Sequence, residues 1–453
     1  MRFFVRCVSV CGMLLAGMSP GFCQIVKPNV ATAKPGYVTM TKTNINAVQQ
    51  PSTSIRLVLP KGVTSTTGLF VNDGNSSAAG SRAAYSRAGN NSPSIRGLNT
   101  VPTFVGAFNS TAPSIDFYQS SDGYTTTSPY IMVGNNPLLG GTTTIPAKIS
   151  TVSLQLLNPN GSTLATVPFK PFEDLVENSP NFSDTNFSVG HTQFGDAVQR
   201  AEFWNMMDPS WHTRLNPTIV NRATIQVPAT VQLAFSDGTI LTVPAYYTYK
   251  ATDGSTVVLL LDLLFNLLDS NQVVSDINGG YFTTDSINYH AYPNTFLFSV
   301  VDEAGDTSCC VLGFHEYFFD PSATPEARWI YDFSSWISPG FFGAGIQDVT
   351  GLSHETSETL NDPFGNNIVP TWQFPGAPPG NCQANLETGD PVEGLPVATV
   401  PIPVRDRNSV FTFHPQTEAL LQWFEVGNAS NAIGGAFSYP NTAALTAAAT
   451  PCN

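Results

Sequence analysis

Residues 348 to 363 of this chain are Asp348-Val349-Thr350-Gly351-Leu352-Ser353-His354-Glu355-Thr356-Ser357-Glu358-Thr359-Leu360-Asn361-Asp362-Pro363. Their apolar positions recur with a helical period, so we predict a helix over about 346–360 that ends before Pro363. At about 100° per residue, His354 and Glu358 lie one turn apart on one face, with Glu355 at its edge. This spacing suits a metal ion held by the outer two side chains. Glu355 then lies where a general base reaches a water on that ion.

The pattern H-E-x-x-E differs by one ligand from H-E-x-x-H, the zinc-binding helix of many peptidases. A third ligand must come from elsewhere, and Asp362 is the local candidate. On a continuous helix Asp362 would lie about 12 Å along the axis from His354, so the chain must turn back before Pro363. His315 and His414 are the rival third ligands.

One histidine and two carboxylates would bring a divalent metal to zero net charge, whereas two histidines and one glutamate leave it at +1. A less positive centre acidifies its water less, which predicts a weaker nucleophile. Carboxylates also favour harder cations than imidazoles do. Zinc is the expected cofactor, and another divalent metal remains open. So does the simpler interpretation, a helix whose acidic residues are solvated on the surface.

The composition favours an exported, β-rich protein. Only 11% of the 453 residues are charged, 42% are hydrophobic, and the net charge is −14. This acidic balance argues against a nucleic-acid partner. The basic start, an apolar run over 8–18 and a polar exit at 21–24 predict a signal peptide at 1–24, and hence a secreted, periplasmic or extracellular protein. No later segment has the ~20 apolar residues that span a bilayer.

Four cysteines follow the predicted signal peptide: Cys309, Cys310, Cys382 and Cys452. An oxidising compartment favours at least one disulfide. We do not expect the adjacent Cys309 and Cys310 to bond to each other. A bond from one of them to Cys382 is the first prediction.

The order of β-prone runs, turn signals and helical periods along the chain predicts an α+β protein with two domains after the signal peptide. Short β-prone runs with turn signals predict an N-terminal β-rich domain at 25–170, with a Ser/Gly/Asn-rich mobile loop at 73–99. The second domain, 171–453 with a C-terminal extension, mixes both element types. We predict helices at 192–206, 256–268 and 418–424, a hairpin around Ser236-Asp237-Gly238, and strands at 294–301, 308–314 and 327–333.

The motif region resembles secreted bacterial proteins that carry S-H-E-x-x-E-x-x-T-D-P, and more distantly the plant phosphate-induced (exordium-like) proteins. The resemblance covers about 188–424, and Asn361 stands where a threonine is usual. It is carried by the segments Gly313-Phe314-His315, Trp336-Ile337-Ser338-Pro339-Gly340, 348–363, Trp372, 195–204 and Phe413-His414-Pro415-Gln416. It implies a zincin-like core with a twisted sheet, a backing helix and the motif helix. It also implies metal at His354 and Glu358, Asp362 as third ligand and Glu355 as base.

These observations together predict a secreted metal-dependent hydrolase, with a zinc peptidase acting on a polypeptide or cell-wall substrate as the leading expectation. Glu355 would activate the metal's water as general base. The alternative is a non-catalytic extracellular or cell-wall-associated binding protein, in which the metal site is structural or degenerate.

Overall fold

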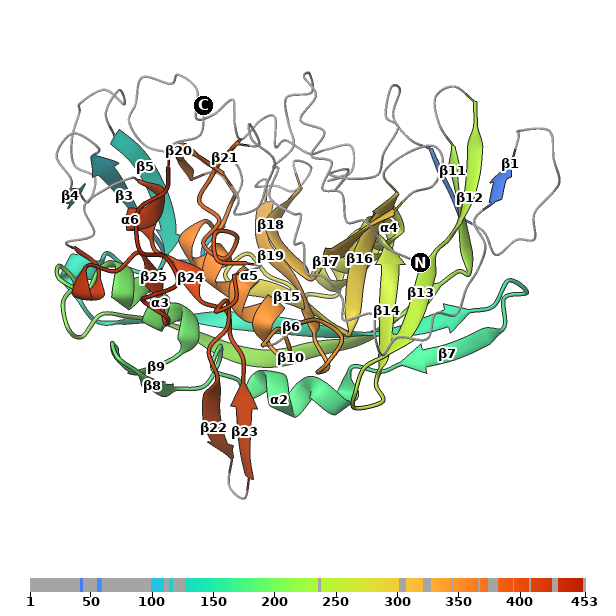
Figure 1. Cartoon of the computed structure of the whole chain (residues 1–453), viewed down its shortest axis with the longest axis horizontal. Helices are drawn as coiled ribbons and strands as arrows, with labels where there is room; N and C mark the ends of the chain where they lie inside the picture. The colour runs from blue at the N-terminus through green and yellow to red at the C-terminus, as the bar shows by residue number, and fades with distance from the viewer. Residues whose placement is uncertain are drawn as a thin grey trace.

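The computed structural model describes residues 41–43, 55–58, 99–109, 114–116, 127–234, 238–300, 307–320, 327–343, 345–365, 367–373, 382–393, 395–406, 409–425 and 431–450. In this part of the chain helices and strands are mixed and β-sheets dominate (Figure 1). The predicted signal peptide at 1–24 and residues 73–98 of the predicted loop lie outside the described residues. No helix among the described residues is long and apolar enough to cross a membrane.

A mixed sheet of six strands forms the centre of the described structure. Its order is β10-β6-β15-β19-β18, and β7 pairs with the C-terminal part of β6. Strands β10, β6, β15 and β19 run parallel, and the edge strand β18 is antiparallel to β19. The strands are β6 (Thr142–Leu157), β7 (Thr163–Val167), β10 (His212–Val227), β15 (Ile287–Pro293), β18 (Gly313–Asp320) and β19 (Ala327–Trp336).

The sheet is buried on both faces, as its inner strands show. Every residue of β15 and of β19 is buried. Side chains alternate between the faces. On β19, Tyr331 and Phe333 enter one core with helix α4 (Asp262–Asn278), while Ile330 enters another with helix α5 (Thr350–Asn361). The alternation therefore places His315 and Asp332, which pair across β18 and β19, on the α5 face.

The described helices and the remaining strands complete the fold around this sheet. The helices are α2 (Glu173–Glu177), α3 (Phe194–Glu202), α4, α5 and α6 (Leu421–Phe424), with 3-10 turns η1 (Pro137–Leu139), η2 (Lys170–Phe172) and η4 (Ile433–Gly435). The outer strands are β1 (Thr41–Thr43), β2 (Ile55–Val58), β3 (Thr103–Asn109), β4 (Ser114–Asp116), β5 (Thr127–Val133), β8 (Thr185–Phe187), β9 (Gly190–Thr192), β11 (Thr230–Ala234), β12 (Ile240–Pro244), β13 (Tyr246–Lys250), β14 (Thr256–Leu261), β16 (Thr295–Val300), β17 (Thr307–Val311), β20 (Ile368–Gln373), β21 (Cys382–Asn385), β22 (Ile402–Asp406), β23 (Ser409–Phe413), β24 (Glu418–Ala419) and β25 (Ser438–Tyr439).

The predicted helix at 256–268 is half wrong. Residues Thr256–Leu261 form strand β14, between β13 and β16, and the helix begins only at Asp262. Five of the six residues of β14 are buried. A short run of β-branched and apolar residues is typical of such an inner strand. A helix and a doubly buried strand share this pattern, and periodicity alone does not separate them.

The predicted boundary at 170 falls between strands of one sheet. Strand β6 lies on its N-terminal side, yet it pairs with β10 and β15 from the other side. The first half of β6 buries its odd-numbered side chains against the α5 face and its second half buries the even-numbered ones. The first half of β6 therefore belongs to the same core as the motif helix, and the second half belongs to the core with α4.

A protonated histidine ties α4 to the sheet on the face opposite the motif helix. The imidazole of His290, fully buried on β15, lies 2.7 Å from Asp269 and 3.0 Å from Asp276 of α4. Tyr292 donates to Asp269 at 2.6 Å, and Tyr331 also bonds to it. Burial alone would lower the pKa of His290, but the charges of the two aspartates and their hydrogen bonds raise it to about 9.

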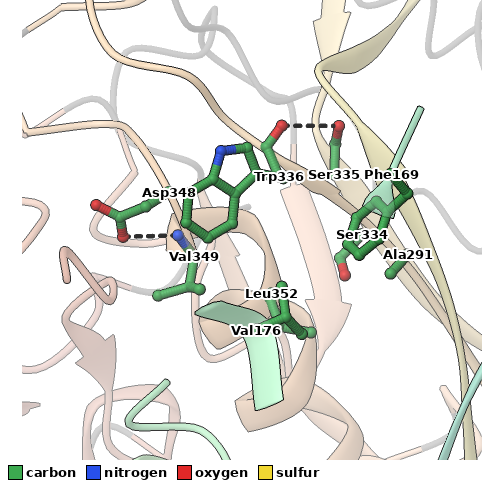
Figure 2. Close-up of a pocket in the computed structure, with 9 residues that line it drawn as sticks. All are labelled: Phe169, Val176, Ala291, Ser334, Ser335, Trp336, Asp348, Val349 and Leu352. Carbon is green, nitrogen blue, oxygen red and sulfur yellow. Dashed lines mark hydrogen bonds between the residues drawn. The ribbon is translucent and has the colours of Figure 1, made fainter. Parts of the chain in front are cut away.

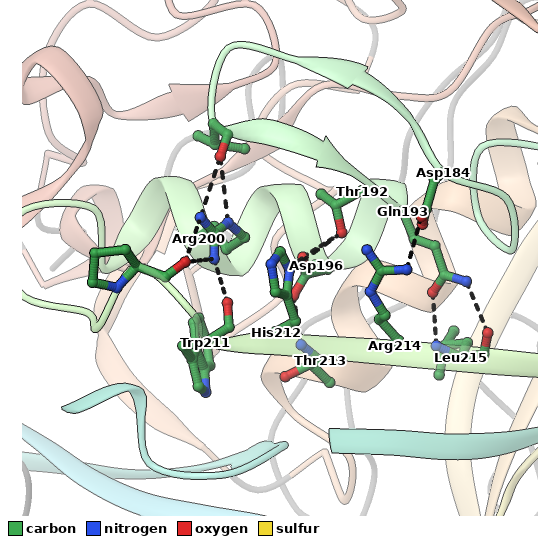
Figure 3. A network of polar contacts seen from close by, with 12 residues as sticks. Asp184, Thr192, Gln193, Asp196, Arg200, Trp211, His212, Thr213, Arg214 and Leu215 are labelled. Atoms are coloured by element: carbon green, nitrogen blue, oxygen red, sulfur yellow. Dashed lines mark hydrogen bonds and ion pairs between the residues drawn. The ribbon is translucent and has the colours of Figure 1, made fainter. Parts of the chain in front are cut away.

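Helix α3 is anchored by side chains that bond to the start of β10 (Figure 3). Asp196 accepts hydrogen bonds from Thr192 and from the backbone of Thr213, and pairs with His212 at 2.7 Å. Arg200 donates to the carbonyl of Trp211 and to two further backbone carbonyls. The helix predicted at 192–206 is thus confirmed over Phe194–Glu202, and it supports α5 from the side.

Cys309 and Cys310 form a disulfide with each other across a cis peptide bond, with their Cα atoms 3.1 Å apart. The prediction that the two would not pair, and that one would bond to Cys382, is therefore wrong.

Candidate metal centre

Helix α5 carries the three motif side chains into the interior of the protein. All twelve residues of α5 are buried, and His354, Glu355 and Glu358 are only 1–2% exposed. The Nε2 atom of His354 lies 3.2 Å from Oε1 of Glu358 and 3.9 Å from Oε1 of Glu355. One ligand atom from each of the three side chains lies within 4.8 Å of the others. The solvated-surface interpretation of this helix is therefore wrong.

The helix is held in place by its two ends and by α3. Asp348, at φ 48°, accepts hydrogen bonds from the backbone N–H groups of Val349 and His414 just before the first turn. The last turn packs against α3, where Gly195 leaves room for the side chain of Leu360. Pro363 ends the helix, since the residue before a proline avoids the helical conformation.

A second group of ligand atoms adjoins the first and shares Glu358 with it. It consists of His315, Glu358 and Glu387, again with donor atoms within 4.8 Å of one another. His315 projects from the edge strand β18, with Nε2 2.9 Å from Oε2 of Glu387 and 3.6 Å from Oε2 of Glu358. Strand β18, helix α5 and the segment after β21 therefore meet at Glu358.

Residues 386–393, which we call the cover segment, lie over the motif helix. The Gly389 N–H donates to Glu358 Oε1 at 3.0 Å, and Asp390 lies 3.7 Å from Nε2 of His354. The Thr388 hydroxyl lies 3.1 Å from that of Ser357 on α5. The cover segment thus contributes two carboxylates to the cluster and closes it from solvent.

Two glycines leave the space that the motif side chains fill. A Cβ on Gly389 would lie 2.3 Å from Nδ1 of His354, and a Cβ on Gly313 of β18 would lie 2.6 Å from the Glu355 carboxylate. Neither position has a positive φ, so close approach and not backbone conformation requires glycine there.

The environments of the two motif glutamates push their pKa values in opposite directions. Burial acts to raise the pKa of Glu358, but the charges of His354 and His315 and the N–H of Gly389 outweigh it, so this pKa is lowered. Burial raises the pKa of Glu355 well above its usual value, against the charge of His354. Opposite shifts of two neighbouring carboxyl pKa values are typical of a site in which one group stays charged and the other acts as an acid or base. Here Glu358 would be the charged ligand and Glu355 the acid or base.

Carboxylates exceed cationic partners in this cluster. Among the described residues, Glu355, Glu358, Glu387 and Asp390 form ion pairs only with the two imidazoles. Neither carboxylate oxygen of Glu355 has a hydrogen-bond partner, and Oε1 of Glu387 also lacks one. A buried ionised carboxylate without a partner costs several kcal/mol. These oxygens, with two converging imidazole nitrogens, fit a divalent cation that takes nitrogen and oxygen ligands.

The sequence-predicted third ligands lie in three different places. His315 is in the cluster. His414 pairs with Asp348 at 2.7 Å at the start of α5 and belongs to neither group. Both carboxylate oxygens of Asp362 accept the Asn367 N–H, at 3.1 and 3.0 Å, and Asp362 also belongs to neither group. Its role as third ligand therefore stays a prediction.

Sequence reasoning did not single out Glu387 or Asp390. The available signal was local: two acidic residues on either side of Gly389, directly before Pro391. Nothing in the sequence indicates that this segment lies over helix α5.

A small cavity lies beside the first turn of α5 (Figure 2). Its volume of about 10 Å³ suits roughly one water molecule. It lies between the start of α5, at Val349 and Leu352, and the end of β19, at Ser335 and Trp336. It is too small and too apolar for a substrate and has no part in the site.

Family models, curated protein sequences and solved structures were each compared with the chain, and none of them matches it.

Proposed function

We propose that this chain is a secreted or extracellular metal-dependent hydrolase of the zincin type that acts on polypeptides. The observation that carries the proposal is the convergence of His354, Glu355 and Glu358 in the interior, with both oxygens of Glu355 lacking a hydrogen-bond partner. A structural ligand set has no need of a third, unpartnered carboxylate at its edge. A general base needs this position.

The proposed roles follow from the contacts. His354 and Glu358 would hold the cation, and Asp390, 3.7 Å from Nε2 of His354, is proposed as a third ligand beside the predicted Asp362. When bound, the cation, for which zinc is the expectation, would polarise the scissile carbonyl and acidify a water. Glu355 would take a proton from the attacking water as the water oxygen bonds to the scissile carbonyl carbon, and would pass this proton to the leaving amine as the C–N bond breaks. Burial raises the pKa of Glu355, which makes its carboxylate a stronger base.

The arrangement of the core supports the zincin-like part of the proposal. The motif helix α5 packs on the edge strand β18 and on its neighbour β19, and β18 runs antiparallel to β19. Helix α3 supports α5 from the side, and α4 covers the opposite face. A twisted sheet, a supporting helix and a motif helix are the three parts that the sequence resemblance implies.

A second candidate function rests on burial. All five side chains of the two ligand groups, and Asp390, are nearly inaccessible beneath the cover segment. A substrate reaches Glu355 only if this segment moves. A permanently closed site would hold a structural metal in a non-catalytic extracellular protein, which is the alternative function.

The direct test is the variant Glu355→Gln, assayed on labelled unfolded casein with zinc content measured in parallel. A hydrolase loses at least 100-fold of its rate in this variant because the base is gone, while zinc stays bound. The variant Glu202→Gln, a buried carboxylate on α3 outside both ligand groups and outside the cover segment, is the matched control. Equal hydrolysis by Glu355→Gln and wild type would refute the role of Glu355.

A disulfide across the cover segment separates the two candidate functions. Ser357 and Thr388 have hydroxyls 3.1 Å apart, so Ser357→Cys with Thr388→Cys places two thiols across the contact. For a hydrolase, oxidation abolishes activity and reduction restores it. For a structural site, neither state hydrolyses casein and both keep the metal. Wild type with and without reductant controls for the Cys309–Cys310 bond.

A further inference from the structure

The two ligand groups are joined through the two oxygens of one carboxylate. Oxygen Oε1 of Glu358 faces His354, at 3.2 Å from its Nε2. Oxygen Oε2 of Glu358 faces His315, at 3.6 Å from its Nε2. A carboxylate with one imidazole at each oxygen has the geometry of a ligand that bridges two cations.

We propose that this cluster holds two divalent cations, with Glu358 as the ligand they share. His354, Glu358 and Asp390 hold the first cation, and this part rests on the proposed function. His315, Glu358 and Glu387 hold the second, which that function neither requires nor assigns. The second group has the composition of a divalent-metal site, with one imidazole nitrogen and carboxylate oxygens.

The charge of the buried cluster favours two cations over one. When all are ionised, Glu355, Glu358, Glu387, Asp390 and the adjoining Asp332 carry five formal negative charges, and His315 and His354 are neutral when they bind metal. One divalent cation leaves −5 + 2 = −3 in an interior that solvent does not reach. Two cations leave −5 + 4 = −1.

The unpartnered atoms of the second group give independent support. Glu387 is 1% exposed, and its oxygen Oε1 has no hydrogen-bond partner, although its other oxygen pairs with His315. Asp332, directly opposite His315 on β19, is a fully buried carboxylate. A cation beside His315 would relieve both carboxylates.

The two positions also differ in how they are built. The ligands of the first cation come from α5 and the cover segment, whereas His315 of the second comes from the edge strand β18. The second cation would therefore fasten the cover segment to the sheet through Glu387, while Glu358 links it to the first. This division predicts that each position can be emptied separately.

The test is the zinc stoichiometry of the metal-stripped full-length protein, by calorimetric titration and by elemental analysis after dialysis. Two equivalents are expected for wild type. One equivalent is expected for Glu387→Gln, which keeps the first position, and one for Asp390→Asn, which keeps the second. The control Glu202→Gln, a buried carboxylate on α3 whose Oε1 accepts the Leu421 N–H, should keep two.

A measurement on wild type alone covers the case in which a variant fails to fold. Manganese(II) added to two equivalents should give the spin-coupled resonance spectrum of a bridged pair in place of that of isolated ions. One equivalent of zinc in wild type, or two uncoupled manganese ions, would overturn the proposal. Two bound cations without casein hydrolysis would sustain it and refute the proposed function. One bound cation with hydrolysis that depends on Glu355 would overturn the two-cation proposal and support the proposed function.

Discussion

The substitution Gly389→Ala tests the contact between the cover segment and the first metal ligand. The added Cβ would lie 2.3 Å from Nδ1 of His354 and 2.5 Å from two ring carbons, where ordinary contact begins at 3.4 Å. The imidazole or the segment must therefore shift by about 3.4 − 2.3 = 1.1 Å. Both are buried, so the strain of overpacking is expected to cost about 1–3 kcal/mol. Displacing a ligand by this much should weaken zinc binding roughly 10–100-fold.

Two assays separate the consequences of Gly389→Ala. Urea unfolding in the presence of chelator measures the cost to the fold, and zinc titration of the folded protein measures the loss of affinity. The matched control is Gly343→Ala, because a Cβ at Gly343 meets nothing within 4 Å and its φ is not positive. If Gly389→Ala equals the control within about 0.5 kcal/mol and binds zinc as tightly as wild type does, the segment does not press on His354 and the account of the site is wrong.

The remaining predictions concern pH, packing and metal removal. The pKa of His290 is about 9 in the folded protein and about 6.5 when unfolded, so its stabilising charge acts fully below pH 6.5 and is lost as pH rises through 9. Urea unfolding should therefore show a free energy of unfolding roughly 3 kcal/mol lower at pH 10 than at pH 6.5. This pH dependence should be much weaker in His290→Gln, and an equal pH dependence in the variant would contradict the role of the His290 charge. Gly195→Ala, whose Cβ would lie 2.4 Å from Leu360, should lower the free energy of unfolding by about 1–3 kcal/mol. The double variant with Leu360→Ala should lose less stability than the two single variants together, and strict additivity would show that the contact is absent. Chelation should lower the melting temperature of wild type but not of Glu358→Gln, and an equal fall in both would place the stabilising metal elsewhere.

Local pattern was sufficient to predict the motif helix and the relation of its side chains. The helix spans Thr350–Asn361 against a predicted 346–360, and His354 and Glu358 lie one turn apart as expected. Its burial was not predictable, since most of its residues are polar and such a stretch usually faces solvent. Burial here depends on the cover segment and on β18, which lie 25 or more residues away in sequence.

The full ligand set illustrates the same limit. Asp362 was the natural choice from sequence because it lies near the motif, but its carboxylate is engaged by Asn367 in the turn that ends the helix. Glu387 lies 29 residues beyond Glu358. It reaches the cluster only because its segment folds back over α5. His315 was a rival candidate on sequence grounds, and strand alternation on β18 is what turns it toward the motif helix.

The central claim is that the buried carboxylates around His354 and Glu358 are compensated by bound cations. The most direct measurement is a crystal structure of the purified full-length protein, with anomalous diffraction recorded at the zinc edge. The account predicts two peaks, one beside Nε2 of His354 and one beside Nε2 of His315, with Glu358 between them. An ordered cluster that shows no anomalous peak after crystals are soaked in zinc would contradict it.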